Sequence, residues 1–348
     1  GPRAGFAYQI DDQTVVRGSY GIFYSLDRGG VDNQLSENPP AVITEFRFDG
    51  PGANVRMSDR IPLPTAVNPN NPVLPLGSGL VYVPRDTKTT MVHQFSANVQ
   101  RELTHSTAVM LAYVGTRGSN LTAVTSSAGF GGGIEGRLTT LQNIGASQYD
   151  SLQVTVRRAP TRGLSYLLSY TLGKATNDTP GQFPGDASAF RNTPTDPRNL
   201  GLDEGYADYD VRHRLTYAGT YELPIMKDNR ILGGWSLNAI VTVQSGSPFT
   251  VYAGDKRADQ SGDPNQGPKT TDQWFDTSVF SSAVGAQGTE KRNAVRGPGY
   301  YNVDMSLFKN FKLRGRSALE LRLEAFNVLN HPQYSQPNQF LGDGNFGK

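Results

Sequence analysis

The 348-residue chain contains no cysteine. This absence excludes a disulfide framework, a cysteine-ligated zinc site and a thiol nucleophile. The chain also lacks any uninterrupted run of about 18 apolar residues, so the sequence predicts no transmembrane helix. An excess of charge of one sign is missing too. With 33 Lys and Arg residues against 31 Asp and Glu residues, charge gives no reason to expect a nucleic-acid partner.

Motifs for catalysis, cofactors and metals are absent as well. No GxSxG nucleophile elbow occurs, and the 4 histidines include no HExxH pair. The glycine-rich segment 129–133 lacks the Lys-Ser/Thr pair that completes a phosphate-binding loop. Asp255, Asp259 and Asp263 do not have the spacing of an EF-hand, and we interpret them as part of a solvated loop. We therefore expect no catalytic residue, no cofactor and no metal site.

What the sequence does contain is a series of runs in which apolar residues occupy every second position. In the run 164–172, leucine or tyrosine stands at each even position, and serine, leucine or threonine stands between them. A period of two is the pattern of a β-strand with two different faces. Ten such runs are predicted as strands: 4–10, 14–24, 91–103, 107–121, 151–157, 164–172, 209–223, 235–244, 301–311 and 317–325.

The connections between these runs alternate in length. Short turns are expected at 11–13, 104–106, 160–163, 224–230 and 312–316. Long connections are expected at 25–90, 122–148, 175–208 and 245–299. Outer-membrane β-barrels have this layout, and their tilted strands need about 9–11 residues to cross the bilayer. We therefore predict an all-β, antiparallel, up-and-down transmembrane β-barrel segment in the cell outer membrane, with short periplasmic turns and long extracellular loops.

Charged residues within the strands predict the polar side of the barrel wall. An arginine facing lipid at the bilayer midplane costs about 2–4 kcal/mol, so charges in spanning strands are expected to face the lumen. We expect Glu320, Arg322 and Glu324 to pair with Arg212, Arg214 or Asp304 on neighbouring strands and to help hold a plug. In a soluble sheet the same residues would form a solvated face. The predicted lumen-facing polar residues are Arg212, Arg214, Asp304, Glu320, Arg322 and Glu324.

The long connections 25–90 and 245–299 are the predicted sites of ligand capture. Loops longer than about 12–15 residues are usually functional or disordered. Trp274 and Phe275 lie in the middle of the second loop, where aromatic rings could contact an extracellular ligand. The sequence does not define the chemistry of that ligand.

Several segments together resemble the C-terminal β-barrel portion of Oar-like TonB-dependent outer-membrane receptors, from residue 2 to about residue 347. They are PRAGFAY at 2–8, GIFY at 21–24, DVRHRL at 210–215, YELP at 221–224, GPGYYNVD at 297–304, FKNF at 308–311 and LEAFNVLNHP at 323–332. The resemblance implies that residues 1–348 supply about ten strands of a barrel of about 22 strands, a size associated with a plugged lumen. It further implies a plug domain and a final strand that are not present in this chain.

The same resemblance implies how the whole protein works. Extracellular loops would capture a ligand, and TonB, acting on the plug through the missing N-terminal part, would energise passage through the lumen. The partners would be TonB, the plug and outer-membrane lipid.

Three alternatives stay open at this point. A passive porin-like or adhesin barrel would have no upstream plug. A soluble secreted β-protein that binds a partner would stay in the aqueous phase without detergent, and a propeller would show repeats of about 40–50 residues, which we do not find. A secreted hydrolase with carboxylates in its loops is a third alternative, which no motif supports.

Overall fold

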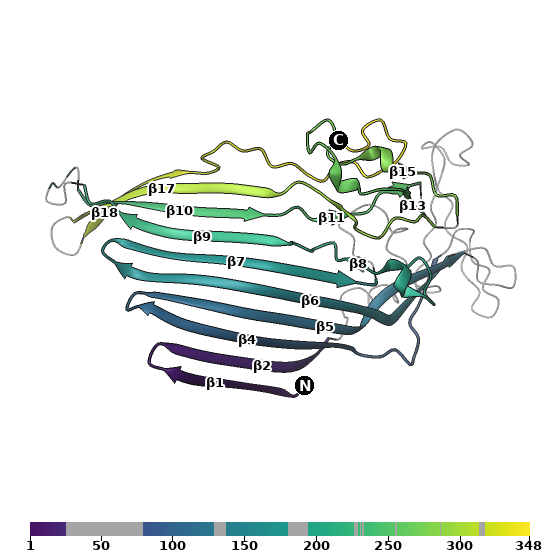
Figure 1. The fold of residues 1–348 in the computed structure, drawn as a ribbon, viewed down its shortest axis with the longest axis horizontal. Coiled ribbons are helices and arrows are strands. Elements are labelled where there is room, and N and C mark those ends of the chain that lie inside the picture. The colour runs from purple at the N-terminus through teal and green to yellow at the C-terminus, as the bar shows by residue number, and fades with distance from the viewer. Residues whose placement is uncertain are drawn as a thin grey trace, which may run out of the picture.

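The ten predicted strands all form, and they lie side by side in chain order (Figure 1). The computed structural model describes residues 1–25, 79–128, 137–179, 194–225, 229, 231, 233–254, 256–285, 287–312 and 317–348. Each of the ten strands pairs antiparallel with its neighbours, and β1 and β18 form the two edges of the sheet. The strands are β1 (Arg3–Asp11), β2 (Thr14–Ser25), β4 (Thr90–Thr104), β5 (Thr107–Ala128), β6 (Arg137–Thr161), β7 (Leu164–Asn177), β9 (His213–Glu222), β10 (Trp235–Gln244), β17 (Tyr300–Lys312) and β18 (Ala318–Ala325).

Short turns gather at one end of the sheet and long connections at the other (Figure 1). In the turn between β6 and β7, Arg162 and Gly163 have φ angles of 54° and 79°. Positive φ at both central residues is typical of a type I′ hairpin turn, whose twist matches that of the flanking strands. In the turn between β1 and β2, an Asp11 carboxylate oxygen accepts a hydrogen bond from the Gln13 backbone N–H at 2.8 Å. The predicted antiparallel, up-and-down arrangement is confirmed.

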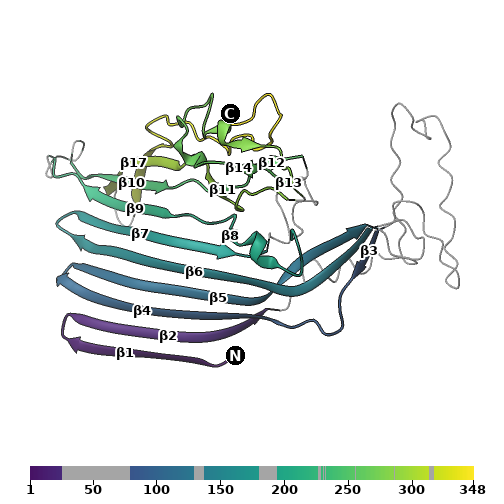
Figure 2. The ribbon, with the colours of Figure 1, turned by 45° about the vertical axis from the view of Figure 1, so that its right-hand side comes forward.

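The predicted loop at 122–148 is wrong, because β5 and β6 continue through most of it. Their pairing extends from Thr107↔Arg158 to Ala128↔Arg137, beyond the ends of β4 and β7 (Figure 2). The strand β3 (Gly79–Tyr82) lies parallel to the far end of β6. The far ends of β5 and β6 are rich in threonine and serine, so they lack the regular apolar alternation by which strands were predicted.

The described residues of 245–299 and 331–348 together form a small folded body, which we call the loop layer. Its buried core consists of Phe249, Val251, Ala258, Phe275, Phe280 and Val295, with Leu341 and Phe346 packed against it. Its short strands are β11 (Pro248–Phe249), β12 (Tyr252–Ala253), β13 (Lys256–Arg257), β14 (Asp259–Gln260), β15 (Phe280–Ser281) and β16 (Val295–Arg296). The C-terminal tail is therefore an integral part of the layer, although it forms no strand of its own.

The segment between β7 and β9 contributes the remaining elements. Strand β8 (Gly205–Tyr206) pairs with the end of β7, and the 3-10 helix η2 (Leu200–Asp203) precedes it. Two further 3-10 helices, η3 (Pro264–Gln266) and η4 (Thr277–Val279), lie in the loop layer. Within the described part of the chain, no helix is long and apolar enough to cross a membrane.

Candidate functional site

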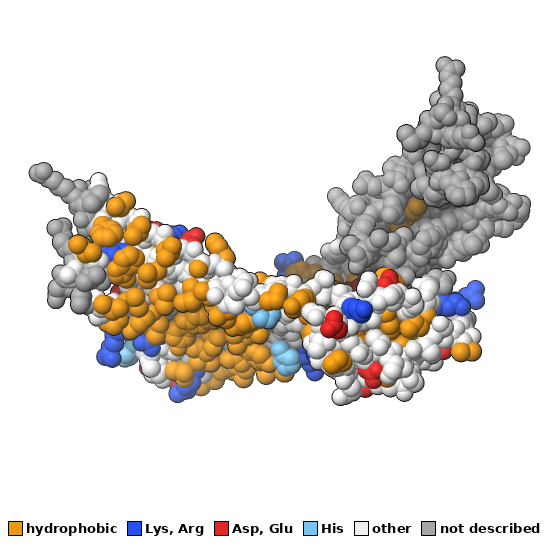
Figure 3. Space-filling view, turned by 90° about the horizontal axis from the view of Figure 1, so that it is seen from above, with side chains coloured by type: hydrophobic (Ala, Val, Ile, Leu, Met, Phe, Trp, Pro, Cys, Tyr) orange, Lys and Arg blue, Asp and Glu red, His pale blue; other side chains and the backbone are white. Residues whose placement is uncertain are grey.

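The strand register sorts the side chains of the sheet into an apolar face and a polar face. On β10, Val241 lies between Tyr217 of β9 and Val303 of β17, and such neighbours on adjacent strands share one face. On the far side of β17, Leu307 pairs with Leu323 of β18 on that same face. Hydrophobic side chains form a broad patch over the sheet toward its short-turn end, and the loop layer beside it carries a mixed surface (Figure 3).

The apolar face has a limited height, which β4 illustrates. Arg101 and His93 stand on this face near the two ends of the strand, and Phe95, Ala97 and Val99 lie between them. Eight residue steps at about 3.4 Å each span about 27 Å along the strand. With a tilt of about 40°, this corresponds to an apolar band about 20 Å thick. The band therefore fits the hydrocarbon thickness of a thin membrane.

Polar and aromatic side chains bound this band toward the long loops. Arg117 of β5 donates hydrogen bonds to both carboxylate oxygens of Asp150 on β6, at 2.9 and 3.1 Å. The Tyr113 hydroxyl donates a third hydrogen bond to Asp150. His93 forms a 2.6 Å hydrogen bond with the Tyr20 hydroxyl. Aromatic rings with polar tips are enriched where a membrane meets water, so this row is consistent with one boundary of the band.

At the short-turn end, Lys309 closes the band. Its ammonium group donates a 2.6 Å hydrogen bond to the Ile231 carbonyl and lies 5.5 Å from the Trp235 ring and 4.7 Å from the Phe311 ring. The charge is thereby sheltered between aromatic rings and a backbone oxygen, which limits the cost of placing it beside an apolar surface.

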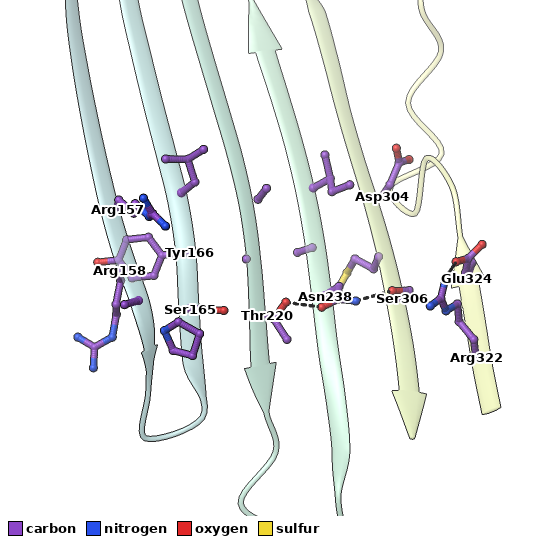
Figure 4. Close-up of a pocket in the computed structure, with 18 of the residues that line it drawn as sticks. Arg157, Arg158, Ser165, Tyr166, Thr220, Asn238, Asp304, Ser306, Arg322 and Glu324 are labelled. Carbon is purple, nitrogen blue, oxygen red and sulfur yellow. Dashed lines mark hydrogen bonds and ion pairs between the residues drawn. The ribbon is translucent and has the colours of Figure 1, made fainter. Parts of the chain in front are cut away.

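The polar face carries hydrogen bonds that cross from strand to strand. The Thr220 hydroxyl of β9 donates to the Asn238 side-chain oxygen of β10 at 2.6 Å, and the Asn238 amide donates to the Ser306 hydroxyl of β17 at 3.1 Å (Figure 4). On the same face, at the other edge of the sheet, Arg17 donates to the Gln100 side-chain oxygen at 2.9 Å. Each of these polar side chains therefore has a hydrogen-bond partner on a neighbouring strand.

A groove of about 870 Å³ lies along this polar face. Its lining includes Arg157, Ser165, Asp304, Arg322 and Glu324, so both signs of charge and several hydroxyl groups line one surface (Figure 4). Such a surface can bind a polar protein segment or a polar solute by hydrogen bonds and ion pairs.

The residues that the register places on the polar face are Arg214, Asp304, Glu320, Arg322 and Glu324. Arg212 lies just before β9, two residues from Arg214, so the same alternation puts it on the polar face too. The three residues of β18 pair with one another along the strand. Arg322 is 2.7 Å from a Glu320 oxygen and 3.5 Å from a Glu324 oxygen. Their assignment to a lumen stays a prediction.

The expected pairing of these β18 residues with Arg212, Arg214 or Asp304 is wrong. Strand β18 is three strand positions from β9, which is about 14 Å at the usual strand spacing. Arg212 instead donates to the Gly173 carbonyl oxygen at 3.4 Å. Asp304 accepts a 2.8 Å hydrogen bond from the Asn327 backbone N–H, which holds the bend after β18.

The two aromatic residues predicted as ligand contacts have different surroundings. Phe275 has 0% exposed surface and packs edge-on against Phe249, Phe280 and Phe346, so it belongs to the core of the loop layer and cannot itself touch a ligand there. Trp274 is partly exposed, and its indole N–H donates to the Arg296 carbonyl oxygen at 2.7 Å. The prediction that Trp274 contacts a ligand stays a prediction.

Ion pairs to buried carboxylates join the loop layer to the segment between β7 and β9, and the sequence did not reveal them. Arg296 pairs with Asp210, and Arg257 lies 3.6 Å from Asp203. Arg292 donates to the Asp203 carbonyl oxygen at 2.8 Å. No sequence pattern marks these pairs, because their members lie far apart along the chain.

In the part of the chain that the structure describes, no group of three or more His, Asp or Glu side chains could hold a metal ion. The Asp259 carboxylate accepts hydrogen bonds from the backbone N–H groups of Val284 and Thr289. The Asp263 carboxylate accepts hydrogen bonds from the Gln266 side chain and the Asn265 backbone N–H, which keep its pKa below the usual value. Asp255 lies outside the described residues. The two described carboxylates thus stabilise the loop backbone.

The chain is similar to one protein family and to several solved structures. The family described as "Outer membrane beta barrel domain" matches residues 1–348. Among curated proteins, none matches the chain. The outer membrane transporter YddB from Escherichia coli has 11% sequence identity and a TM-score of 0.55, covering 94% of this chain and 36% of that one. The siderophore receptor PiuA from Acinetobacter baumannii has 12% identity and a TM-score of 0.49, covering 94% and 31%.

The chain thus spans about a third of the length of these two solved structures. At 11% identity the similarity to YddB concerns the fold alone. The fold agrees with the register, in which an uncharged band on one face is backed by hydrogen-bonded polar side chains on the other.

Proposed function

The chain belongs to the outer-membrane β-barrel domain family, and from this membership we propose that it is part of the barrel wall of a TonB-dependent receptor. In the whole protein, extracellular loops capture a ligand, which then passes through a plugged lumen with energy supplied through TonB. The chain itself contributes binding surfaces and a wall, and the proposal includes no catalytic step.

The observation that carries this proposal is the contrast between the two faces of one sheet. The apolar face, bounded by Lys309 at one end and by Arg117 with Asp150 at the other, suits contact with lipid. The polar face, with the Thr220–Asn238–Ser306 hydrogen bonds and the groove beside them, suits an enclosed polar interior. In a soluble sheet the apolar face would need a covering layer.

We assign the plug to the polar face. Strand β18 carries an ion-paired row formed by Glu320, Arg322 and Glu324. Each of the three side chains is more than 40% exposed, so their charges are available to a second surface. A plug seated there would satisfy these groups by further hydrogen bonds and ion pairs. The long connections at the other end of the sheet, including the loop layer, would meet the ligand first.

Conductance tests whether the lumen is plugged. The full-length protein that contains this chain, inserted in planar lipid bilayers, is expected to stay closed. Asn238→Leu removes the central side chain of the hydrogen-bonded row and is expected to increase the open fraction by loosening the plug. The neighbouring variant Ala239→Leu, on the apolar face, is the matched control and should stay closed. A stable open pore in the wild-type protein would instead favour a passive porin.

A binding assay tests the source of energy. The purified periplasmic domain of TonB is expected to bind the full-length protein in detergent, and to bind more tightly when the extracellular ligand is present. A protein that remains closed in bilayers yet never binds TonB would contradict the energised mechanism and leave an adhesin as the better assignment.

A further inference from the structure

Three basic residues stand on the apolar face close to the short turns. They are Arg101 of β4, Arg158 of β6 and Lys309 of β17, and each lies three residues before the last residue of its strand. Arg101 lies 3.7 Å from a carboxylate oxygen of Asp11, and Lys309 is enclosed by its backbone and aromatic contacts. No described residue forms a hydrogen bond or an ion pair with the Arg158 side chain, and its Nε is buried without a partner. Arg158 therefore differs from the other two in having no acceptor within the described part of the chain.

The strand register defines the surroundings of Arg158. Its cross-strand neighbours are Thr107 of β5 and Tyr166 of β7, which both carry hydroxyl groups. Arg158 and Tyr166 lie side by side, and the Arg158 guanidinium extends toward the turn between β6 and β7 (Figure 4). The next row toward the middle of the band is apolar, since Val156 stands opposite Leu168. An arginine without a carboxylate neighbour on its own face therefore stands at the border of the apolar band.

A tyrosine of β9 extends this border. Gly219 stands opposite Tyr166, and a Cβ atom at Gly219 would lie 2.2 Å from the Tyr217 hydroxyl oxygen. The missing side chain of Gly219 thus makes room for the Tyr217 ring to reach the row of Arg158 and Tyr166. The two tyrosine rings are 6.1 Å apart between centroids. Tyrosine rings with polar tips are enriched where a membrane meets water, so this row has the composition of a headgroup level.

Positive charge is concentrated around the short turns. The whole chain has nearly equal numbers of basic and acidic residues, 33 and 31, whereas the segments that contain the short turns have twice as many Lys and Arg residues as Asp and Glu residues. These segments are 11–13, 101–107, 157–163, 222–231 and 309–316. Such an excess of basic residues attracts an anionic membrane surface.

We propose that Arg158 binds the phosphate group of an anionic phospholipid in the membrane leaflet next to the short turns. The headgroup lies beside Tyr166, and the acyl chains follow Val156 and Leu168 into the apolar band. The N–H groups of a guanidinium match the oxygens of a phosphate. A zwitterionic headgroup also brings an ammonium group, and neither cross-strand neighbour of Arg158 is a carboxylate that would hold it. This inference rests on the proposed function, in which the apolar face meets lipid.

Local fluorescence quenching tests the site. The chain has no cysteine, so a fluorophore on Val156→Cys, in the full-length protein with any other cysteine replaced, reports which lipid lies next to Arg158. The protein is reconstituted in mixed bilayers in which either phosphatidylglycerol or phosphatidylcholine carries brominated chains, which quench the fluorophore on contact. The expected result is stronger quenching by phosphatidylglycerol at equal proportions. The apparent preference should be about fivefold, the size expected for one basic residue at an anionic membrane surface.

Three variants make the result decisive. Arg158→Gln should abolish the preference, and Arg158→Lys, which keeps the charge, should retain most of it. Arg162→Asn is the matched control, because it removes an exposed arginine from the adjacent turn, and asparagine accepts the φ of 54° at this position. Its preference should equal that of the wild type. Equal quenching by the two lipids in the wild type would overturn the proposal, as would a preference that survives Arg158→Gln.

The lipid site and the barrel wall fail in different ways. Quenching by brominated phosphatidylcholine shows that a variant is folded with Val156 in contact with lipid. A label on Thr155→Cys, on the polar face, provides the level of quenching without lipid contact. If both lipids quench the Val156→Cys label only to that level, the apolar face does not meet lipid, and the proposed function fails together with the site. Strong quenching without a preference refutes the lipid site alone.

Discussion

Arg296 of the loop layer forms an ion pair with the buried carboxylate of Asp210, which lies just before β9. The Asp210 side chain is 1% exposed and also accepts a 2.5 Å hydrogen bond from the Ala175 backbone N–H at the end of β7. Arg296 donates further to the carbonyl oxygens of Asp210 and Gly246, and its guanidinium lies 4.7 Å from the Tyr206 ring. Arg296 therefore links two segments of the chain, the one between β7 and β9 and the one between β10 and β17.

The first prediction concerns this connection. Arg296→Met leaves the Asp210 carboxylate buried without its partner, which is expected to destabilise the loop layer by about 3–5 kcal/mol. Limited proteolysis of the folded protein should then cut within 245–299 much faster than in the wild type. Arg198→Met removes an exposed arginine from the neighbouring segment and should leave the cutting rate unchanged. Equal protection of Arg296→Met and the wild type would contradict the role of this ion pair.

A second prediction separates the two faces of one strand. Leu168 stands on the apolar face near the middle of β7, and Ser169, its neighbour, stands on the polar face. Leu168→Arg should destabilise the protein folded in lipid bilayers, reducing its free energy of unfolding by about 2–4 kcal/mol. Ser169→Arg should have little effect on that free energy. Urea titrations of folding into vesicles measure both values. Similar losses in the two variants would show that lipid does not discriminate between the faces.

The third prediction distinguishes the two aromatic residues of the loop layer. Phe275 is fully buried, so Phe275→Ala should cost about 3–5 kcal/mol and expose the loop layer to protease. Trp274→Ala removes a partly exposed ring at the edge of the core and should cost much less protection than Phe275→Ala, so a loss of ligand binding in a variant that stays protected reflects a lost contact. Loss of protection in Trp274→Ala to the same degree would assign Trp274 to the core as well.

The fourth prediction is a pH dependence of loop-layer stability. The carboxyl of Glu290 has a pKa of about 8 in the folded layer against 4.5 in an ordinary environment. Between these values the unfolded layer has lost the proton that the folded layer still holds, so stability falls as pH rises from 4.5 and levels off above about 8. Protease protection of 245–299, followed across this range, should decline in the wild type. Glu290→Gln should flatten the curve, and a decline that survives this substitution must come from another group.

The strands were predictable where lipid dictates the side chains. In β7, Leu164, Tyr166, Leu168, Tyr170 and Leu172 alternate with smaller, mostly polar residues, and this period of two is visible without coordinates. The far ends of β5 and β6 lie beyond that apolar band, and there the alternation weakens although the backbone pairing continues. The predicted boundary at residues 121 and 148 therefore marked the edge of the apolar band and not the ends of the strands.

Part of the candidate site could likewise be predicted from the sequence, and the rest required the tertiary structure. The sequence was sufficient to place Glu320, Arg322 and Glu324 together on one face, because residues two apart in a strand share a face. Their pairing partners required the strand order, which sets β9 three positions away from β18. The burial of Phe275 required the tail, since Phe346, seventy-one positions later, packs against its ring.

By itself, the sequence determined the local features of this protein: which runs are strands, which side chains share a face, and at which end the long connections lie. Each follows from the two-residue period of the strand and from the contrast between lipid and water. Only the tertiary structure decided how the loops fold together, which arginine neutralises which carboxylate, and that Glu290 is enclosed in the loop layer. These contacts join segments far apart in the chain, and burial depends on atoms that a linear pattern does not record.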